Sequence, residues 1–240
     1  MPEKPAGWDE RLDGTQVGAI LADAGVEPAA PGDGTLFGES VLVLHQWPGS
    51  PADGLRYSIL GTTGTVLARC ARTLTEQPDP AHASFGELVD NANTDRLTLS
   101  DPTGAPLAQL THKKVWKSRI TLTDPSGQEI GLLKQENVLG KVRLGLTAGG
   151  RRVGRIVSDN TQLLGFTISD EAKNPIGRIT KLGRYAEPGL LGRREVLGCY
   201  VLQLRIRPAQ PLHALAVAAP LAIDLAFSMV QAGQRSLARA

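Results

Sequence analysis

Residues 97–133, LTLSDPTGAPLAQLTHKKVWKSRITLTDPSGQEIGLL, contain the same strand–turn–strand unit twice, and this unit decides the fold. In each copy, alternating apolar residues lead into a turn, either Asp101–Gly104 (DPTG) or Asp124–Gly127 (DPSG). The aspartate bonds to the turn backbone, the proline presets the next dihedral angle, and the glycine accepts the positive φ before the second strand. Alternation with a period of two is typical of β-strands. Each copy is therefore predicted to form an antiparallel hairpin.

The second strand of this unit recurs along the chain as an apolar residue, a small residue, any residue and an apolar residue. Its last four copies begin at residues 107, 130, 153 and 176, an equal spacing of 23 residues. Five such hairpins, with strands at Leu42–Leu44 and Tyr200–Ile206, predict about a dozen antiparallel strands, and sheets of that size usually close. The small residue predicts a β-bulge or the close approach of the last segment of the chain. The copies are Leu67–Cys70, Leu107–Leu110, Ile130–Leu133, Val153–Ile156 and Ile176–Ile179.

Residues 211–230, PLHALAVAAPLAIDLAFSMV, form an almost unbroken apolar stretch that opens with proline, as helices often do. The stretch is long enough to span a bilayer, so a membrane anchor is one interpretation. His213, Pro220 and Asp224 favour a helix buried in the core, because a carboxylate at mid-span is costly in lipid. Asp224 is expected to be a paired structural carboxylate and His213 a hydrogen-bonded core residue. They share a helix face but lie about three turns apart, too far for a catalytic pair.

Together these segments resemble the tubby C-terminal-like superfamily and, within it, the phospholipid scramblase and LURP-one-related branch. The resemblance covers residues 36–230 and is carried by the two DPxG turns and by Leu42–Arg72, Ser169–Lys181 and Pro211–Phe227. It implies a mainly β fold, a closed antiparallel barrel of about twelve strands over residues 36–232, with the helix of residues 211–230 threaded through its centre. An acidic, Pro- and Gly-rich flexible leader over residues 1–35, with one short helix near Val17–Ala24, is expected before the barrel, and a tail over residues 233–240 after it.

The sequence departs from this family in the features associated with calcium and lipid anchors. Animal scramblases carry an acidic segment before the final helix, whereas Cys199–Ala209 has no carboxylate, and a cysteine-rich acylation cluster is also missing. We therefore expect no calcium, no other metal and no cofactor. The chain has no Gly-x-Ser-x-Gly, phosphate-loop or HExxH motif, its four histidines are dispersed, and Cys70 and Cys199 fit core positions. No enzymatic activity is expected.

Charge is distributed unevenly along the chain. Residues 1–94 carry 5 Lys and Arg against 13 Asp and Glu, whereas residues 95–207 carry 19 against 10. A basic body suits an anionic partner, although solvated surface charge is the simpler interpretation. Residues 112–119 interleave cations with a tryptophan, which suits a membrane interface. The candidate residues for binding lipid headgroups are Lys113, Lys114, Trp116, Lys117, Arg119, Arg151, Arg152, Arg155, Arg178 and Lys181.

These residues predict a non-enzymatic protein that binds anionic phospholipid headgroups peripherally, and the resemblance adds lipid scrambling as an extension. The phosphates of nucleic acid are an alternative partner for the same basic face, although Trp116 alone offers a stacking platform. A tail-anchored protein with residues 211–230 in the bilayer is the other alternative. No basic stretch followed by an apolar run opens the chain, so a secretory signal is not expected. We expect a cytoplasmic protein that associates peripherally with membranes; its oligomeric state is left open, with a monomer favoured.

Overall fold

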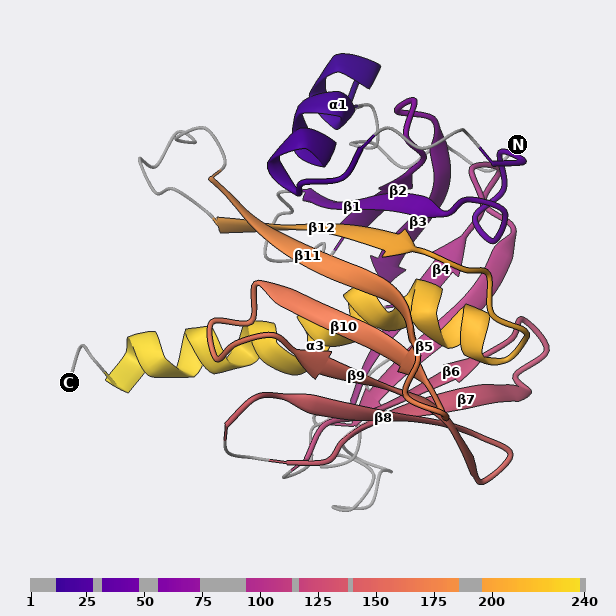
Figure 1. Ribbon diagram of the computed structural model, residues 1–240, viewed down its shortest axis with the longest axis vertical. Coiled ribbons are helices and arrows are strands. Elements are labelled where there is room, and N and C mark those ends of the chain that lie inside the picture. Colours follow the sequence, from indigo (N-terminus) through magenta and orange to yellow (C-terminus); the bar gives the residue numbers. More distant parts are fainter. Residues whose placement is uncertain are drawn as a thin grey trace, which may run out of the picture.

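The strands close into a complete barrel in the computed structural model, which describes residues 12–27, 32–47, 56–73, 94–113, 117–137, 140–185 and 196–237 (Figure 1). Over those residues there are twelve strands, each antiparallel to its neighbours, and β1 closes the ring by pairing with both β2 and β12. The mainly β, closed antiparallel barrel predicted from the repeat is confirmed. The strands are β1 (Val41–Trp47), β2 (Arg56–Leu60), β3 (Val66–Arg72), β4 (Thr94–Ser100), β5 (Pro106–Lys113), β6 (Arg119–Thr123), β7 (Glu129–Gln135), β8 (Arg143–Ala148), β9 (Arg151–Ser158), β10 (Gly165–Asp170), β11 (Pro175–Tyr185) and β12 (Val196–Leu204).

Each of the five repeated units forms a hairpin whose second strand contains a β-bulge. The register shifts at the same place in the pairs β2–β3, β4–β5, β6–β7, β8–β9 and β10–β11. A bulge bends its strand and increases the local twist, which helps a sheet to curl until its edges meet. The predicted bulges are confirmed. The residue without a cross-strand partner is the apolar one before the small residue of each unit, namely Leu67, Leu107, Ile130, Val153 or Ile176.

Glycine at the small position of the unit makes room for the helix inside the barrel. A Cβ atom on Gly131 would lie 3.0 Å from Leu215 Cδ1. A Cβ atom on Gly154 would lie 2.9 Å from Leu212 Cδ1 and 2.6 Å from Ser169 O. Because Leu212 and Leu215 belong to the C-terminal helix, the predicted close approach of the last segment is confirmed.

The C-terminal helix α3 (Leu212–Leu237) runs through the barrel, and its C-terminal end extends past the strands (Figure 1). Every side chain from Leu212 to Ala226 is buried, and the apolar ones form one core with the inward-facing residues of the strands. A helix that is apolar on all sides is thereby covered completely. Within the described ranges, no helix has the combined length and hydropathy that a transmembrane span requires.

Helix α3 is longer than the apolar run predicts. It begins one residue after the predicted start and continues to Leu237, beyond the predicted end at residue 230 and into the predicted tail of residues 233–240. The residues that follow the apolar run include Gln, Ala, Arg and Leu, which have good helix propensity. The apolar pattern therefore predicts how far the helix is buried, and it does not predict where the helix ends.

Helix α1 (Gly14–Asp23) lies within the predicted leader, at the place where a short helix was expected. Its first turn is fixed by a capping box, in which Asp13 N donates to Gln16 Oε1 at 2.9 Å and Gln16 N donates to Asp13 Oδ1 at 2.8 Å. One face of α1, formed by Val17, Ile20 and Leu21, is buried against the outside of the barrel. The leader of residues 1–35 thus contains a packed element, because an i, i+3, i+4 apolar stripe was present in a Pro- and Gly-rich segment.

Strand β1 is buried on both faces. Leu42 and Leu44 belong to the core around α3, whereas Val41 and Val43 pack under α1 together with residues of β12. A strand covered on both faces has no polar side, so its sequence shows a continuous apolar run and not an alternation.

Candidate functional site

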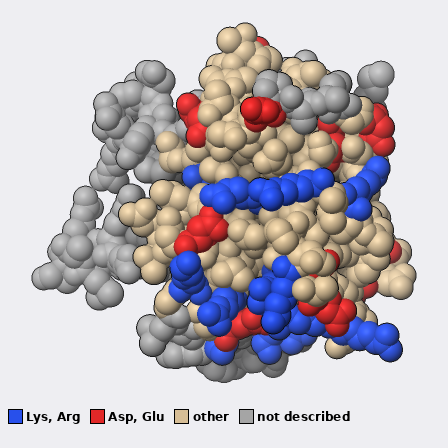
Figure 2. Space-filling view, in the orientation of Figure 1, with Lys and Arg blue, Asp and Glu red and all other residues tan. Residues whose placement is uncertain are grey.

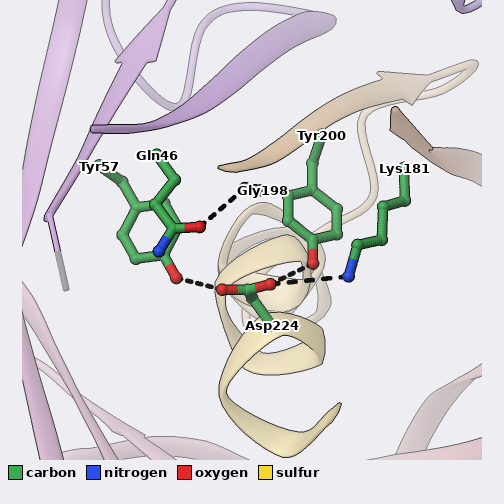
Figure 3. A network of polar contacts seen from close by, with 6 residues as sticks. All are labelled: Gln46, Tyr57, Lys181, Gly198, Tyr200 and Asp224. Carbon is green, nitrogen blue, oxygen red and sulfur yellow. Dashed lines mark hydrogen bonds and ion pairs between the residues drawn. The ribbon is translucent and has the colours of Figure 1, made fainter. Parts of the chain in front are cut away.

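Asp224 lies on α3 inside the barrel and is 2% exposed (Figure 3). Its carboxylate accepts hydrogen bonds from the hydroxyls of Tyr57 on β2 and Tyr200 on β12. The ammonium of Lys181 on β11 lies 3.8 Å from Asp224 Oδ1 and 5.2 Å from the centre of the Tyr200 ring. Three strands therefore each direct one polar group at the carboxylate, as a buried charge requires.

The two tyrosines act as hydrogen-bond donors at neutral pH. Burial, and then the charge of Asp224, raise the pKa of both hydroxyls well above the ordinary tyrosine value. Beside them, the N–H of Gly198 donates to Gln46 Oε1 at 2.7 Å, which links β12 to β1 (Figure 3). This buried group ties α3 to several strands, which is a structural function.

The structure places Lys181 inside the barrel, and not on the outer basic face expected from the sequence. Its direct cross-strand partner is Tyr200, and directly opposed residues share one face of a sheet. The Lys181 side chain is only 20% exposed. Arg178 and Lys181 are three residues apart, and an odd spacing in a strand puts two side chains on opposite faces. The spacing in the sequence already contains the signal that only one of them can face outward.

His213 and Pro220 also lie on α3 and are buried. His213 is 3% exposed and packs edge-on against Phe37, with the ring centres 6.0 Å apart. The burial expected for this core histidine is confirmed, and its Nε2 has no hydrogen-bond partner in the described part of the chain. Burial, and then the charge of Arg207, lower the pKa of His213, so the imidazole is neutral at pH 7.

Four cations on the barrel occupy one row of directly opposed positions in neighbouring strands. Lys113 on β5 pairs with Arg119 on β6, and Arg119 pairs with Lys134 on β7. The row continues from Lys134 through Gly145 on β8 to Arg155 on β9. We call Lys113, Arg119, Lys134 and Arg155 the cationic row.

The cationic row faces outward, because the next positions along its strands point into the core. Directly opposed side chains have Cβ atoms about 4.5–5.5 Å apart, and like charges at that distance destabilise a sheet. Among the described residues, no carboxylate lies within 4.0 Å of the charged groups of Arg119, Lys134 or Arg155. The core residues next to the row are Ile120, Leu133 and Ile156.

Arg155 carries a second sign of incomplete pairing. The residue is half-buried, and its Nε is buried with no hydrogen-bond partner among the described residues. A buried donor without a partner costs about 1–3 kcal/mol. Like charges are directly opposed between Lys113, Arg119 and Lys134, whereas Gly145 separates Lys134 from Arg155. The repulsion among these three cations decreases when an anion lies across the row. The arrangement therefore suits an anionic ligand that extends over several strands.

A carboxylate also lies beside the row, that of Glu136. It fills the gap at Gly145, where a Cβ atom would lie 2.6 Å from Glu136 Oε1, and it pairs with Arg152 Nη2 at 3.0 Å. Lys117 Nζ donates to the backbone oxygen of Glu136 at 2.9 Å. Two of the predicted headgroup residues, Lys117 and Arg152, are thus held by Glu136.

The remaining predicted residues lie in different surroundings. Arg178 Nη2 pairs with Asp159 Oδ2 at 2.7 Å, and Arg151 is exposed where β9 begins. Lys114 and Trp116 lie outside the described residues. Figure 2 shows the face of the protein that is turned to the viewer in Figure 1. On this face, Lys and Arg side chains gather in one band across the middle and in a larger group along the lower edge, over β8 and β9.

Sequence reasoning missed Lys134. The register of the β6–β7 hairpin, counted outward from the turn at Asp124–Gly127 with one bulge allowed, pairs Lys134 with Arg119. The repeat and its turn therefore contained the signal, but the candidates were chosen from clusters along the chain and not from cross-strand positions.

Comparisons with protein-family models, with curated proteins and with solved structures found no match to this chain. The closed barrel with α3 inside it is consistent with the tubby-like fold. Among the described residues, no group of three or more His, Cys, Asp and Glu side chains could hold a metal ion. Cys70 and Cys199 are both buried, and they do not form a disulfide with each other.

Proposed function

We propose that this chain is a non-enzymatic protein of the tubby-like superfamily, close to the phospholipid scramblase and LURP-one-related branch, that binds anionic phospholipid surfaces. The observation that carries the proposal is the register of the cationic row, which aligns Lys113, Arg119, Lys134 and Arg155 on one outer face. Three of these cations have no carboxylate partner among the described residues. A surface of phosphates and carboxylates, repeated at close spacing, supplies partners to these three cations.

The expected strength of this attachment follows from the number of cations. Each basic residue near an anionic membrane surface contributes about 1 kcal/mol, so the row supplies about 4 kcal/mol, or about a thousandfold in affinity. Exposed charges are screened within about 8 Å at physiological salt, so the attachment is reversible and sensitive to ionic strength. These properties describe a peripheral protein of the cytoplasmic leaflet, where anionic lipids are concentrated.

The proposal is for binding and not for scrambling. The row accounts for attachment to a lipid surface, and it offers no route for a headgroup through a bilayer. The segment of α3 from Leu212 to Ala226 is enclosed by the barrel, so its apolar side chains are occupied by core contacts.

The test is flotation of detergent-free protein with phosphatidylcholine vesicles, with and without phosphatidylserine, at low and high salt. Salt-sensitive flotation with the anionic vesicles alone is the expected result. Salt-resistant flotation with both kinds of vesicle would contradict the proposal and place α3 in the bilayer. Absence of flotation would also contradict it, and binding to a nucleic acid at the same salt would then identify the alternative partner.

A further inference from the structure

A second cationic feature lies where α3 begins, on different elements from the cationic row. A small open pocket of about 100 Å³ lies between the segment before β1 and the connection from β12 to α3. A space of about 10–15 Å³ on this measure already admits one water molecule, so the pocket accommodates several waters or a small polar group. The polar residues that line it are Glu39, Ser40, Arg205, Arg207 and His213.

His213 is the buried polar group of this pocket. It is 3% exposed, and its Nε2 is buried without a hydrogen-bond partner among the described residues. Most buried polar atoms in folded proteins have a hydrogen-bond partner, so this nitrogen can still take one. The imidazole is neutral at pH 7, because burial and the charge of Arg207 lower its pKa. A neutral ring with the proton on Nε2 can donate one hydrogen bond to an oxygen in the pocket.

Arg205 and Arg207 supply positive charge at the same place. Both residues are exposed, and no carboxylate among the described residues lies within 4.0 Å of their guanidinium groups. Two acids are near. Hydrogen bonds from Thr35 and the charge of Arg207 lower the pKa of Asp33. The carboxylate of Glu39 lines the pocket, but it is already bonded to its own loop.

That loop occupies both carboxylate oxygens of Glu39. The N–H of Gly32 donates to Oε2 at 2.9 Å, and the N–H of Gly34 donates to Oε1 at 3.1 Å. Glu39 therefore orders the loop, and the residues that line the pocket carry two positive charges against one negative charge. Arginine is well suited to a phosphate, because its planar fork of N–H groups matches two phosphate oxygens.

The start of α3 adds a favourable field but few direct contacts. The N–H groups of His213 and Leu215 donate to Ala209 O and Pro211 O at 3.3 and 3.2 Å, and that of Ala214 donates to Gln210 Oε1 at 3.2 Å. These donors are used within the first turn. The helix dipole still places a partial positive charge at this end, so an anion is stabilised there while side chains make the contacts.

We propose that this pocket binds a phosphate monoester group, held by Arg205 and Arg207 and accepting a hydrogen bond from His213 Nε2. The group has two sources, a phospholipid with a terminal phosphate or a soluble phosphate ester. Ile206 bears on which source is used, because this residue lies between the two arginines in the sequence and its side chain is 55% exposed. An exposed apolar side chain flanked by arginines favours the lipid source, since it can enter the acyl region while the arginines contact the headgroup.

The first experiment titrates the full chain with glycerol 3-phosphate at constant ionic strength, with chloride as the reference anion. Calorimetry gives the affinity, and the ¹⁵N resonance of His213 Nε2 reports whether the ring contacts the ligand. We expect Arg205→Ser/Arg207→Ser to weaken binding by at least about tenfold, because charge-assisted hydrogen bonds are lost. The control Lys141→Ser/Lys173→Asn removes two other exposed cations and should bind as the wild type does. Circular dichroism verifies that both variants are folded.

The second experiment distinguishes the lipid from the soluble ester. Phosphatidylcholine vesicles with and without phosphatidic acid are floated with the wild type and with Ile206→Ser. Weaker flotation of Ile206→Ser, with unchanged affinity for glycerol 3-phosphate, supports the lipid source, and unchanged flotation supports the soluble ester. The proposal is overturned if the wild type binds neither probe, if the arginine variant binds as tightly as the control, or if the His213 resonance does not move. The titration with glycerol 3-phosphate tests the pocket alone, so its failure leaves the proposed membrane function untouched. A wild type that does not float with phosphatidic acid vesicles contradicts the proposed membrane function as well, because the cationic row is intact.

Discussion

Replacement of Asp224 by leucine removes the acceptor around which the buried polar group is built. Two tyrosine hydroxyls then lack their partner, at about 1–3 kcal/mol each, and the ammonium of Lys181 loses its counter-charge at a position only 20% exposed. Breaking a buried ion pair on one side costs about 3–5 kcal/mol, so we expect Asp224→Leu to lower the free energy of unfolding by about 4 kcal/mol. The total for a domain is about 5–15 kcal/mol, so the variant should fold but be much weaker.

The assay is urea denaturation at neutral pH, followed by circular dichroism. With a slope of about 2 kcal/mol per molar urea, the midpoint should fall by about 2 M without a change in the slope. Asp224→Asn keeps one acceptor oxygen and should lower the free energy of unfolding by less than Asp224→Leu does. Lys181→Met removes the cation alone and should also lower the midpoint, whereas a surface lysine would leave it unchanged. A loss below about 1 kcal/mol for Asp224→Leu would refute the claim that this carboxylate ties α3 to the barrel.

Three further predictions concern titration, packing and surface charge. Because the pKa of Tyr57 is raised in the folded chain, its contribution to stability is fully present below about pH 10 and is lost as the pH rises further. Tyr57→Phe should therefore flatten the decline of the urea midpoint at alkaline pH. An equal decline in both proteins would disprove the raised pKa of Tyr57. A Cβ atom on Gly154 would contact Leu212 and Ser169, whereas Gly183 has open space around it. Thermal unfolding should therefore show that Gly154→Ala lowers the free energy of unfolding by about 2 kcal/mol and Gly183→Ala by less than about 0.5. Equal melting temperatures would argue against the close approach of α3. Glu136→Gln removes the carboxylate beside the cationic row and should strengthen binding to anionic vesicles about fivefold in a sedimentation assay, and weaker binding would contradict the position of the row.

The barrel could be predicted because its information is local and repeated. Each hairpin needs only a turn such as Asp101–Gly104 and two alternating strands, and the equal spacing of the units specifies antiparallel neighbours. Closure followed from strand number, and the small residue at an inward position, such as Gly131, marked both the adjacent bulge and the approach of α3. The packing of α1 was harder to foresee, because Val17, Ile20 and Leu21 form a stripe whose partner, the outside of β1, is distant in sequence.

The site could be predicted only in part, because it depends on which face each side chain takes. The candidate residues were grouped by their closeness along the chain, which put Arg178 and Lys181 together although they point to opposite faces of β11. The same grouping omitted Lys134, which the strand register places beside Arg119. The bulge at Val153 has the opposite effect, since it puts Arg152 and Arg155 on the same outer face despite their odd spacing. To predict which side chains share the outer face, the cross-strand register must first be derived from the turns and the bulges together.

The most direct test of the proposed membrane function compares two variants that lose the same charge. Arg119→Ser/Lys134→Ser removes two adjacent members of the cationic row, whereas Lys141→Ser/Lys173→Asn removes two exposed lysines outside it, with asparagine chosen because Lys173 has a φ of 71°. Affinity for vesicles of phosphatidylcholine and phosphatidylserine is measured at physiological salt. We predict about thirtyfold weaker binding for the row variant and a change below about threefold for the control. Equal losses in the two variants, or no loss in either, would contradict a defined lipid-binding row.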